Sequence, residues 1–404
     1  MQAIPVRTPE LTLSLEQGVP PRPRLHAVDL VRGLVMVLMA LEHVRVWFSG
    51  IGIEPADLSR VSTAQLVTRW VTSGCAPVFA LLAGAGASLA LAQGKSVKEQ
   101  ARFLAVRGAL LVLLELTVVR LLWTFHAGLG GEPPVLQAIW ALGVSMVALA
   151  GLMALPRPVV GAIGVAVVAG HDLLDGVAPA ALGSWSWLFR LLHVQGPVVL
   201  PGGMQFVVLY PVLPWIGVLA LGYALGPVLT MPEETRRRTL IRLGGVLIAA
   251  FLLLRAWNAY GDPARWSIHP EIGRTVLSFL DPTTNPPSLL FLLMTLGPAL
   301  VALGLAERWR GVAGDVLVVL GRVPLFYYVL HLGLMHALAL VIGTLAGFEP
   351  GAFLTAWPFL PPGWGYGLPV VFAVWMAVVL ALYPACRWFA ALKASRPERW
   401  WRYL

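Results

Sequence analysis

Ten long apolar runs, separated by shorter polar segments, dominate the pattern along the chain. They cover about residues 27–49, 67–92, 102–124, 135–154, 156–173, 205–229, 239–258, 287–306, 314–345 and 366–391. A transmembrane helix needs about 20 predominantly apolar residues, and most of these runs approach or exceed that length. The pattern therefore predicts an all-α, polytopic membrane bundle of about ten transmembrane helices. We expect a single domain over residues 25–404.

The ninth run is long for one span and is interrupted by Gly321, Arg322 and Pro324. The residue before a proline is disfavoured in the helical region. We therefore expect a break there and a span that begins near Val323. The pattern leaves open whether residues 314–320 form a short helix of their own.

Composition and charge support the membrane class and add an orientation. The chain is 58% hydrophobic and 12% charged, whereas soluble domains carry about 25% charged residues. The net charge of +9 is concentrated in both ends and in alternate loops. Because Lys and Arg gather on the cytoplasmic side, we predict that both termini are cytoplasmic. The positive charge is then explained by membrane orientation and does not indicate nucleic-acid binding. Residues 1–24 are Pro-rich and polar and lack an apolar core segment. This composition predicts a disordered cytoplasmic tail and not a cleavable signal peptide.

The segments on the predicted outer side are longer and rich in Trp, Pro, Gly and His. We expect "GSWSWLFRLLHVQGPVVLPGG" (183–203) to be partly ordered helix at the interface, where an external substrate could be held. The alternative is that Trp185, Trp187 and Trp364 are ordinary interfacial aromatics. Within the second apolar run, the small residues of "LLAGAGASLA" (81–90) favour close helix packing.

The first run carries more ionisable residues than a lipid-facing transmembrane helix would be expected to contain. At 100° per residue, one narrow stripe collects five of its positions: Asp29, Arg32, Met36, His43 and Trp47. A charge at the centre of a span costs roughly 2.5–3.5 kcal/mol. The stripe is therefore expected to face protein or water, and Glu42 and Arg45, which point elsewhere, are expected to pair.

Within this stripe two kinds of role are open. Asp29 and Arg32 are spaced for an ion pair one turn apart, and they could serve only to anchor the start of the helix. His43 lies about 16 Å further along, toward the predicted outer half. Intramembrane ionisable residues are functional candidates and histidine titrates near working pH. His43 is thus a candidate catalytic or substrate-binding residue, and a hydrogen-bonded structural histidine is the alternative.

A second constellation lies in "GRVPLFYYVLHLGLMHAL" (321–338). Tyr327, Tyr328 and His331 share a stripe, and a tyrosine hydroxyl can orient an imidazole or bind an acyl carbonyl. His336 is rotated about 140° away. A packed polar seam between helices is the alternative for all four residues.

The remaining polar groups within the runs predict no other chemistry. We expect Glu115 and Arg120 to bond to other helices, and we interpret His171, Asp172 and Arg255 as structural. Neither an HExxH motif nor a compact set of histidines occurs, so no metal site is predicted. The two cysteines lie in apolar stretches and form no disulfide framework.

Five segments occur in an order that is typical of one group of proteins. They are "DLVRGLVMVLMALEHVRVWF", "TRWVTSGCAPVFALLAGAGASLA", "LYPVLPWIGVLALGYALG", "PPSLLFLLMTLGPAL" and "LGRVPLFYYVLHLGLMHALA". With them the chain resembles the DUF1624 group of bacterial membrane proteins. These are related to the catalytic domain of heparan-alpha-glucosaminide N-acetyltransferase, within the wider transmembrane acyltransferase superfamily. The resemblance runs from about residue 24 to the C-terminal end.

This resemblance implies transfer of an acyl group, most simply acetyl, across the bilayer. It implies acetyl-CoA on the cytoplasmic side and an acceptor amine or hydroxyl on the outer side of a bacterial inner membrane. The acceptor would be an envelope glycan or a lipid-linked sugar. Asp29, Arg32 and Gly33 match the "DxxRG" opening of the heparan enzyme, and His43 matches the position of an essential histidine in the related acyltransferase-3 proteins.

One departure affects the assignment of the catalytic base. The heparan enzyme has a "HAxWNG" stretch after its first span, whereas residues 50–66 here contain neither His nor Trp. At the position aligned with His43 that enzyme has Asn. The chemistry is therefore expected at His43 or at another histidine.

The roles that we assign from these considerations are as follows. His43 acts as general base or carries a transient acyl group, with His331, Tyr328 and His336 as the other candidate catalytic residues. The candidate residues for binding acetyl-CoA are Asp29, Arg32 and Tyr327.

Two other functions remain open on the residues alone. A transporter or flippase could use the same polar stripe as a substrate pathway. A non-enzymatic membrane scaffold is the other alternative, although it would not explain why ionisable residues form the stripe. Membrane lipids are the expected surroundings, and a homodimer is one option for the oligomeric state.

Overall fold

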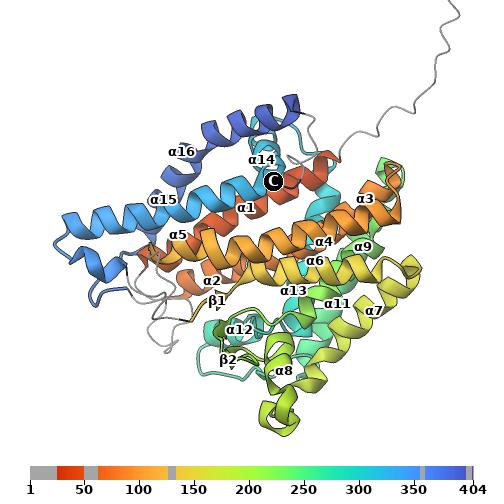
Figure 1. Ribbon diagram of the computed structural model, residues 1–404, viewed down its shortest axis with the longest axis horizontal. Helices are drawn as coiled ribbons and strands as arrows, with labels where there is room; N and C mark the ends of the chain where they lie inside the picture. Colours follow the sequence, from red (N-terminus) through yellow and green to blue (C-terminus); the bar gives the residue numbers. More distant parts are fainter. Residues whose placement is uncertain (1–24, 50–61, 126–132, 355–359, 397–402, 404) are drawn as a thin grey trace, which may run out of the picture.

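The computed structural model describes residues 25–49, 62–125, 133–354, 360–396 and 403. It is a bundle of long helices with a layer of short elements along one side (Figure 1). In the first half of the chain the helices are α1 His26–Phe48, α2 Thr63–Ser73, α3 Cys75–Ala92, α4 Val97–Leu114, α5 Arg120–Thr124, α6 Ala138–Leu152, α7 Arg157–Gly170 and α8 Ser186–His193. The later helices are α9 Leu213–Ala224, α10 Gly226–Leu229, α11 Glu233–Trp257, α12 Ile272–Leu280, α13 Leu289–Ala306, α14 Val312–Arg322, α15 Pro324–Leu345 and α16 Leu368–Ser395.

Each of the ten apolar runs contains one or more of these helices, so the all-α class is confirmed. Within the described part of the chain, six helical segments are long and apolar enough to cross a membrane, judged on length and composition. They are Thr63–Ala92, Arg157–Leu174, Glu233–Trp257, Leu289–Ala306, Pro324–Leu345 and Leu368–Ser395. The apolar helices α6 and α9 are shorter. The predicted tail, residues 1–24, lies outside the described residues.

The charged helix α1 lies inside the bundle. It contacts α2, α3, α13, α14, α15 and α16, and Figure 1 shows it running among the long helices. Its Asp29 and Arg45 are buried. This placement avoids the free-energy cost of exposing charged side chains to lipid, because the polar stripe of α1 faces protein and a cavity.

Glycines allow the closest helix crossings. A Cβ at Gly33 of α1 would overlap a backbone carbonyl of α14, and a Cβ at Gly321 of α14 would overlap the carbonyl of Asp29. Gly84 of α3 lies in the same way against the backbone of α9. Small residues permit such backbone approach, and the packing role predicted for residues 81–90 is confirmed.

The predicted break in the ninth run is also confirmed. Helix α14 ends at Arg322, α15 begins at Pro324, and Val323 between them has the non-helical angles φ −130° and ψ 47°. Residues 312–322 form a helix of their own, which settles the question that the pattern left open.

The prediction was wrong where two apolar runs begin with strands. The strands β1 Val135–Leu136, β2 Gly196–Val199 and β3 Gln205–Val208 form a sheet in the order β1-β3-β2. In this sheet β1 and β3 are parallel, and β2 and β3 are antiparallel. The helix of the sixth run, α9, therefore begins at Leu213 and not near residue 205. The 183–203 stretch is partly helical, as expected, because it contains α8, and its second half contains β2. The missed signal is a hairpin: Val-rich stretches flank Gly202 and Gly203, which both have positive φ.

Candidate active site

A cavity of about 560 Å³ passes between α1, α2, α3, α4, α6, α13 and the start of α15. Basic side chains line one end, which we call the basic end. The other end, which we call the loop end, is lined by Thr284 and Asn285 from the segment before α13. Four members of the predicted α1 stripe face this cavity: Asp29, Arg32, Met36 and His43. The fifth, Trp47, lies outside the lining and stacks on His336 with ring centroids 4.2 Å apart.

At the basic end, Asp29 is held between two arginines. Arg32 Nη1 donates to Asp29 Oδ1 over 3.1 Å and to the carbonyl of Gly321 over 3.3 Å. Arg322 Nε lies 3.7 Å from Asp29 Oδ2. The predicted ion pair between Asp29 and Arg32 is confirmed. The sequence pattern missed Arg322, which reaches the site because α14 ends there.

Helix α4 brings further polar atoms to the same end. Gln100 and Arg107 are seven residues apart, so they share one face of the helix, and both line the cavity. Gln100 Oε1 and Arg107 Nε are buried and have no hydrogen-bond partner among the described residues. Arg107 is close enough to Arg32 for the two cations to repel. An anionic ligand would relieve this repulsion and accept a hydrogen bond from Arg107 Nε, whereas Gln100 Oε1 would need a donor group of the ligand.

Two histidines from distant parts of the chain meet beside the cavity. His43 Nδ1 lies 2.8 Å from His331 Nε2, and His331 Nδ1 lies 2.9 Å from the carbonyl of Tyr327. A carbonyl can only accept, so the His331 proton is on Nδ1 and its Nε2 carries a lone pair. His43 must then donate from Nδ1. Its Nε2 is left with a lone pair, as a general base requires.

Aromatic rings fix the plane of the His43 imidazole. The ring of Trp123 meets it edge to face at a centroid distance of 5.5 Å, and the ring of Tyr328 does so at 6.1 Å. Tyr328 lines the cavity together with His43. Of the two predicted tyrosines, Tyr328 lines the cavity and Tyr327 does not, so the Tyr328 hydroxyl is the one that can reach a ligand in this space. Packed neighbours of this kind hold a catalytic side chain in one rotamer.

The neighbouring carboxylate, Glu42, is bonded to Arg45 and Thr72. Glu42 lines the cavity, and Arg45 Nη2 donates to its Oε1 over 2.5 Å. Thr72 Oγ1 of α2 donates a short hydrogen bond to Glu42 Oε2. The predicted pair of Glu42 and Arg45 is confirmed, and it ties α1 to α2 beside the histidine pair.

Three of the predicted site residues lie behind the cavity wall: Tyr327, His331 and His336. The ring of Tyr327 stacks on that of His331 at 5.2 Å, and Tyr327 is absent from the lining. His336 is sandwiched between Phe125 at 3.8 Å and Trp47 at 4.2 Å. Its two ring nitrogens face the carbonyls of Leu122 and Phe353 at 2.8 and 2.7 Å. These contacts suit a structural role for His336 and an indirect one for His331.

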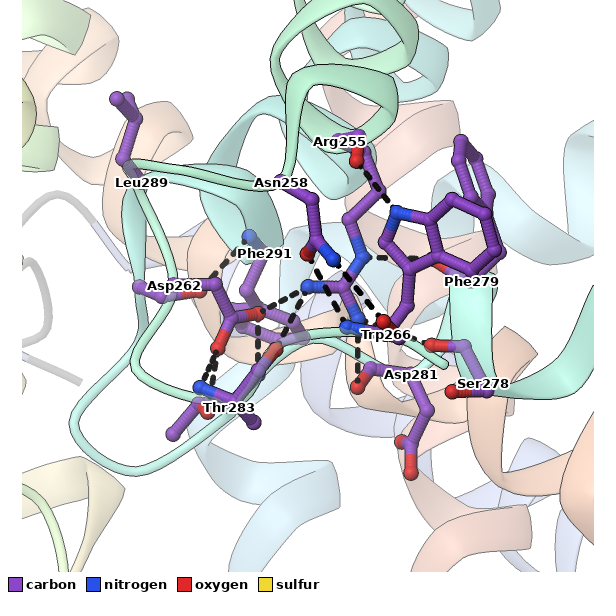
Figure 2. A network of polar contacts seen from close by, with 12 residues as sticks. Arg255, Asn258, Asp262, Trp266, Ser278, Phe279, Asp281, Thr283, Leu289 and Phe291 are labelled. Carbon is purple, nitrogen blue, oxygen red and sulfur yellow. Dashed lines mark hydrogen bonds and ion pairs between the residues drawn. The ribbon is translucent and has the colours of Figure 1, made fainter. Parts of the chain in front are cut away.

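The segment at the loop end is held by a buried ion pair, which Figure 2 shows. Arg255, at the end of α11, donates from Nη1 to Asp262 Oδ2 over 3.1 Å and to the carbonyl of Ala264. Its Nη2 donates to the carbonyl of Ser278 and its Nε to that of Phe279. Asp262 accepts from both the backbone N–H and the hydroxyl of Thr283. Burial raises the pKa of the Asp262 carboxyl, so acid neutralises this side of the pair before it neutralises an exposed aspartate.

A second pair of side chains holds the same segment from its other side. His171 Nε2 donates to the carbonyl of Pro287 over 2.9 Å. The backbone N–H of Leu289 donates to Asp172 Oδ2 over 3.0 Å. The structural interpretation of His171, Asp172 and Arg255 fits these contacts. Among the described residues no group of three or more His, Cys, Asp or Glu side chains is arranged to hold a metal ion.

Comparison with known proteins places the chain in a family. No curated protein matches the chain. The model of the family described as heparan-alpha-glucosaminide N-acetyltransferase, catalytic, matches residues 24–254. The match includes His43 and the α4 residues of the basic end, and it stops before His331, Tyr328 and the loop end. Since it covers more than half of the 404 residues, the chain belongs to the heparan-alpha-glucosaminide N-acetyltransferase catalytic-domain family.

Proposed function

We propose that this protein is a membrane-embedded acyltransferase that uses acetyl-CoA to acetylate an amine or hydroxyl of a sugar. The observation that carries the proposal is the His43–His331 pair beside a cavity that continues to a basic end. Family membership supports acyl transfer as the reaction class. We place the protein in a bacterial inner membrane, with the basic end on the cytoplasmic side and a sugar of the cell envelope at the loop end.

The donor would bind along the length of the cavity. The phosphates of CoA would pair with Arg32, Arg107 and Arg322, since guanidinium groups bind phosphate with charge-assisted hydrogen bonds. Residues 32 and 43 are about 16 Å apart along α1. An extended pantetheine arm would follow this stretch and bring the thioester to His43.

In the proposed reaction, His43 takes a proton from the acceptor and later gives it to the leaving CoA thiolate. The acceptor nitrogen or oxygen attacks the thioester carbonyl carbon while His43 Nε2 takes its proton. The carbon–sulfur bond then breaks, and the CoA thiolate leaves and receives that proton. His331 accepts the hydrogen bond from His43 Nδ1–H throughout, which stabilises the imidazolium form. The hydroxyl of Tyr328 would donate to the developing oxyanion.

The test is release of free CoA by the purified protein in liposomes supplied with acetyl-CoA and D-glucosamine. General base catalysis contributes about 10²–10⁴-fold, so His43→Ala should lose activity by that order. The matched control is His269→Ala, because His269 is an exposed histidine whose ring contacts only the nearby Ser267 in the described structure. It should behave as the wild type.

Other outcomes would separate the remaining functions. Equal CoA release by folded wild type and His43→Ala would remove His43 from the chemistry. Movement of a sugar across the liposome bilayer without CoA release would favour a transporter. Arg107→Ala should raise the KM for acetyl-CoA with little change in kcat if the basic end holds the donor.

A further inference from the structure

At the loop end, the side chain of Asn285 faces the cavity and its amide oxygen, Oδ1, is buried with no hydrogen-bond partner among the described residues. Its Nδ2 reaches only the hydroxyl of Thr284, at 3.5 Å, which is long for a hydrogen bond. A buried polar atom left unpaired is costly to the folded protein, so Oδ1 is free to accept a hydrogen bond from a ligand.

The backbone around Asn285, in contrast, is well anchored. Asp262 holds Thr283 on one side, through the backbone N–H at 3.0 Å and the hydroxyl at 2.7 Å. His171 and Asp172 hold Pro287 and Leu289 on the other. The segment also closes on itself, because the N–H of Ser288 donates to the carbonyl of Thr283 over 3.1 Å. A side chain carried by a segment that is fixed at both ends is positioned before any ligand arrives.

The cavity that Asn285 lines also presents groups that match the chemistry of a sugar. Gln137, Tyr210 and Trp215, which lie just before α6, just before α9 and near the start of α9, line the same cavity and supply an amide, a phenol and aromatic surface. Amide side chains and hydroxyls fix the orientation of a neutral polar ligand, and aromatic rings cover its less polar face. The phosphate-binding chemistry lies at the other end of the cavity, with Arg32 and Arg107.

We infer that Asn285 is a specificity-determining residue of the acceptor subsite, where its Oδ1 accepts a hydrogen bond from a hydroxyl or amino group of a hexosamine. This inference rests on the proposed function and names the acceptor side of the same site. The bond would fix which group of the sugar faces His43 Nε2. Asn285 lies beyond residues 24–254, so the family match does not bear on it.

The test compares Asn285→Leu with the wild type in two measurements. The first is kinetic, with acetyl-CoA as donor and methyl α-D-glucosaminide as acceptor. A site built to bond a polar group loses at least about tenfold when the partner is removed. The KM for the glucosaminide should therefore rise about tenfold or more, and the KM for acetyl-CoA should stay within about twofold.

The second measurement is binding of methyl α-D-glucosaminide to the detergent-solubilised protein by calorimetry, with no donor present. The wild type should bind the sugar, and Asn285→Leu should bind it at least about tenfold more weakly. The thermal midpoint of the variant should not fall, because Oδ1 bonds to nothing in the described structure. A merely structural role would lower the midpoint and leave the ratio of the two KM values unchanged.

The outcomes keep the two proposals apart. Sugar binding that depends on Asn285, without any CoA release by the wild type, would sustain the subsite and overturn the acyltransferase. Acetyl transfer with an unchanged KM for the glucosaminide in Asn285→Leu would overturn the subsite and sustain the acyltransferase. Absence of sugar binding to the wild type in both measurements would also overturn the subsite. His269→Ala serves as the control, since His269 is exposed and lies outside the cavity lining.

Discussion

At the scale of the residue, the central feature is the order of donors and acceptors through two histidines. The carbonyl of Tyr327 determines the tautomer of His331, and His331 in turn determines that of His43. Neither imidazole alone would have a defined lone pair facing the cavity. His331 is therefore a positioning residue, and its contribution to the reaction acts through His43.

This role predicts a difference between two substitutions of His331. His331→Leu removes the acceptor for His43 Nδ1–H, and we expect kcat to fall about 10–100-fold, as when the orienting partner of a metal-ligating histidine is lost. His331→Gln retains an acceptor near the Nε2 position and should recover part of the activity. Steady-state kinetics and thermal midpoints of the two variants check this expectation.

The control for this prediction lies in the comparison itself. Both variants remove the bond to Tyr327, so a purely structural effect would lower their midpoints and their activities together. Equal activities of the Leu and Gln variants would contradict the positioning role.

At the scale of the element, the crossing of α1 and α14 determines the shape of the basic end. Gly33 and Gly321 let the two backbones approach each other, and this approach brings Arg322 to Asp29. It also allows the break at Val323, after which α15 carries Tyr328 and His331 toward α1. The site is thus assembled by a close helix crossing followed by a change of helix direction.

The substitution Gly321→Ala tests this crossing. Its Cβ would overlap the Asp29 carbonyl, which is backbone and cannot rotate away. Overpacking of this kind costs about 1–3 kcal/mol, so the thermal midpoint and the rate of CoA release should both fall.

Gly245→Ala is the matched control in helix α11, where a Cβ meets no atom within 4 Å. Alanine is favoured over glycine inside a helix by up to about 1 kcal/mol, so this variant should be at least as stable as the wild type. Equal midpoints for the two alanine variants would show that the α1–α14 approach is not tight.

At the scale of the whole molecule, the cavity has chemically different ends. Arg32, Arg107 and Arg322 line the basic end, whereas the segments before α9 and α13 contribute Tyr210, Thr284 and Asn285; Arg69 of α2 also lines the cavity, near Glu42. A layer of short elements, among them α8, α12 and the strands, lies below the long helices in the view of Figure 1. The distribution of basic residues along the chain predicts that the basic end faces the cytoplasm.

Cysteine labelling would test this orientation. Val312, at the start of α14, and Ile268, in the segment between α11 and α12, are exposed side chains. An impermeant maleimide added to intact cells should label Ile268→Cys and not Val312→Cys, and inside-out vesicles should give the reverse. The two native cysteines are buried, so the unsubstituted protein should show little labelling. The opposite pattern would invert the topology and the side from which acetyl-CoA is bound.

The sequence by itself determined the helical class, the runs that become helices and the break before Pro324. It also indicated the polar stripe of α1 and the two local ion pairs within that helix. These features depend on hydrophobic periodicity and on neighbours three or four residues apart, which the sequence displays directly. The strands at 196–199 and 205–208 were missed because short apolar stretches beside a turn resemble the start of a span.

Only the tertiary structure decided which candidates meet and which remain apart. It paired His43 with His331 across 288 positions, turned Tyr327 and His336 away from the cavity, and brought Arg107, Arg322 and Asn285 into it. A helical projection gives the face of a side chain but not the partner that this face meets. The partner depends on helix crossings and on anchored loops, which result from packing between residues far apart in the chain.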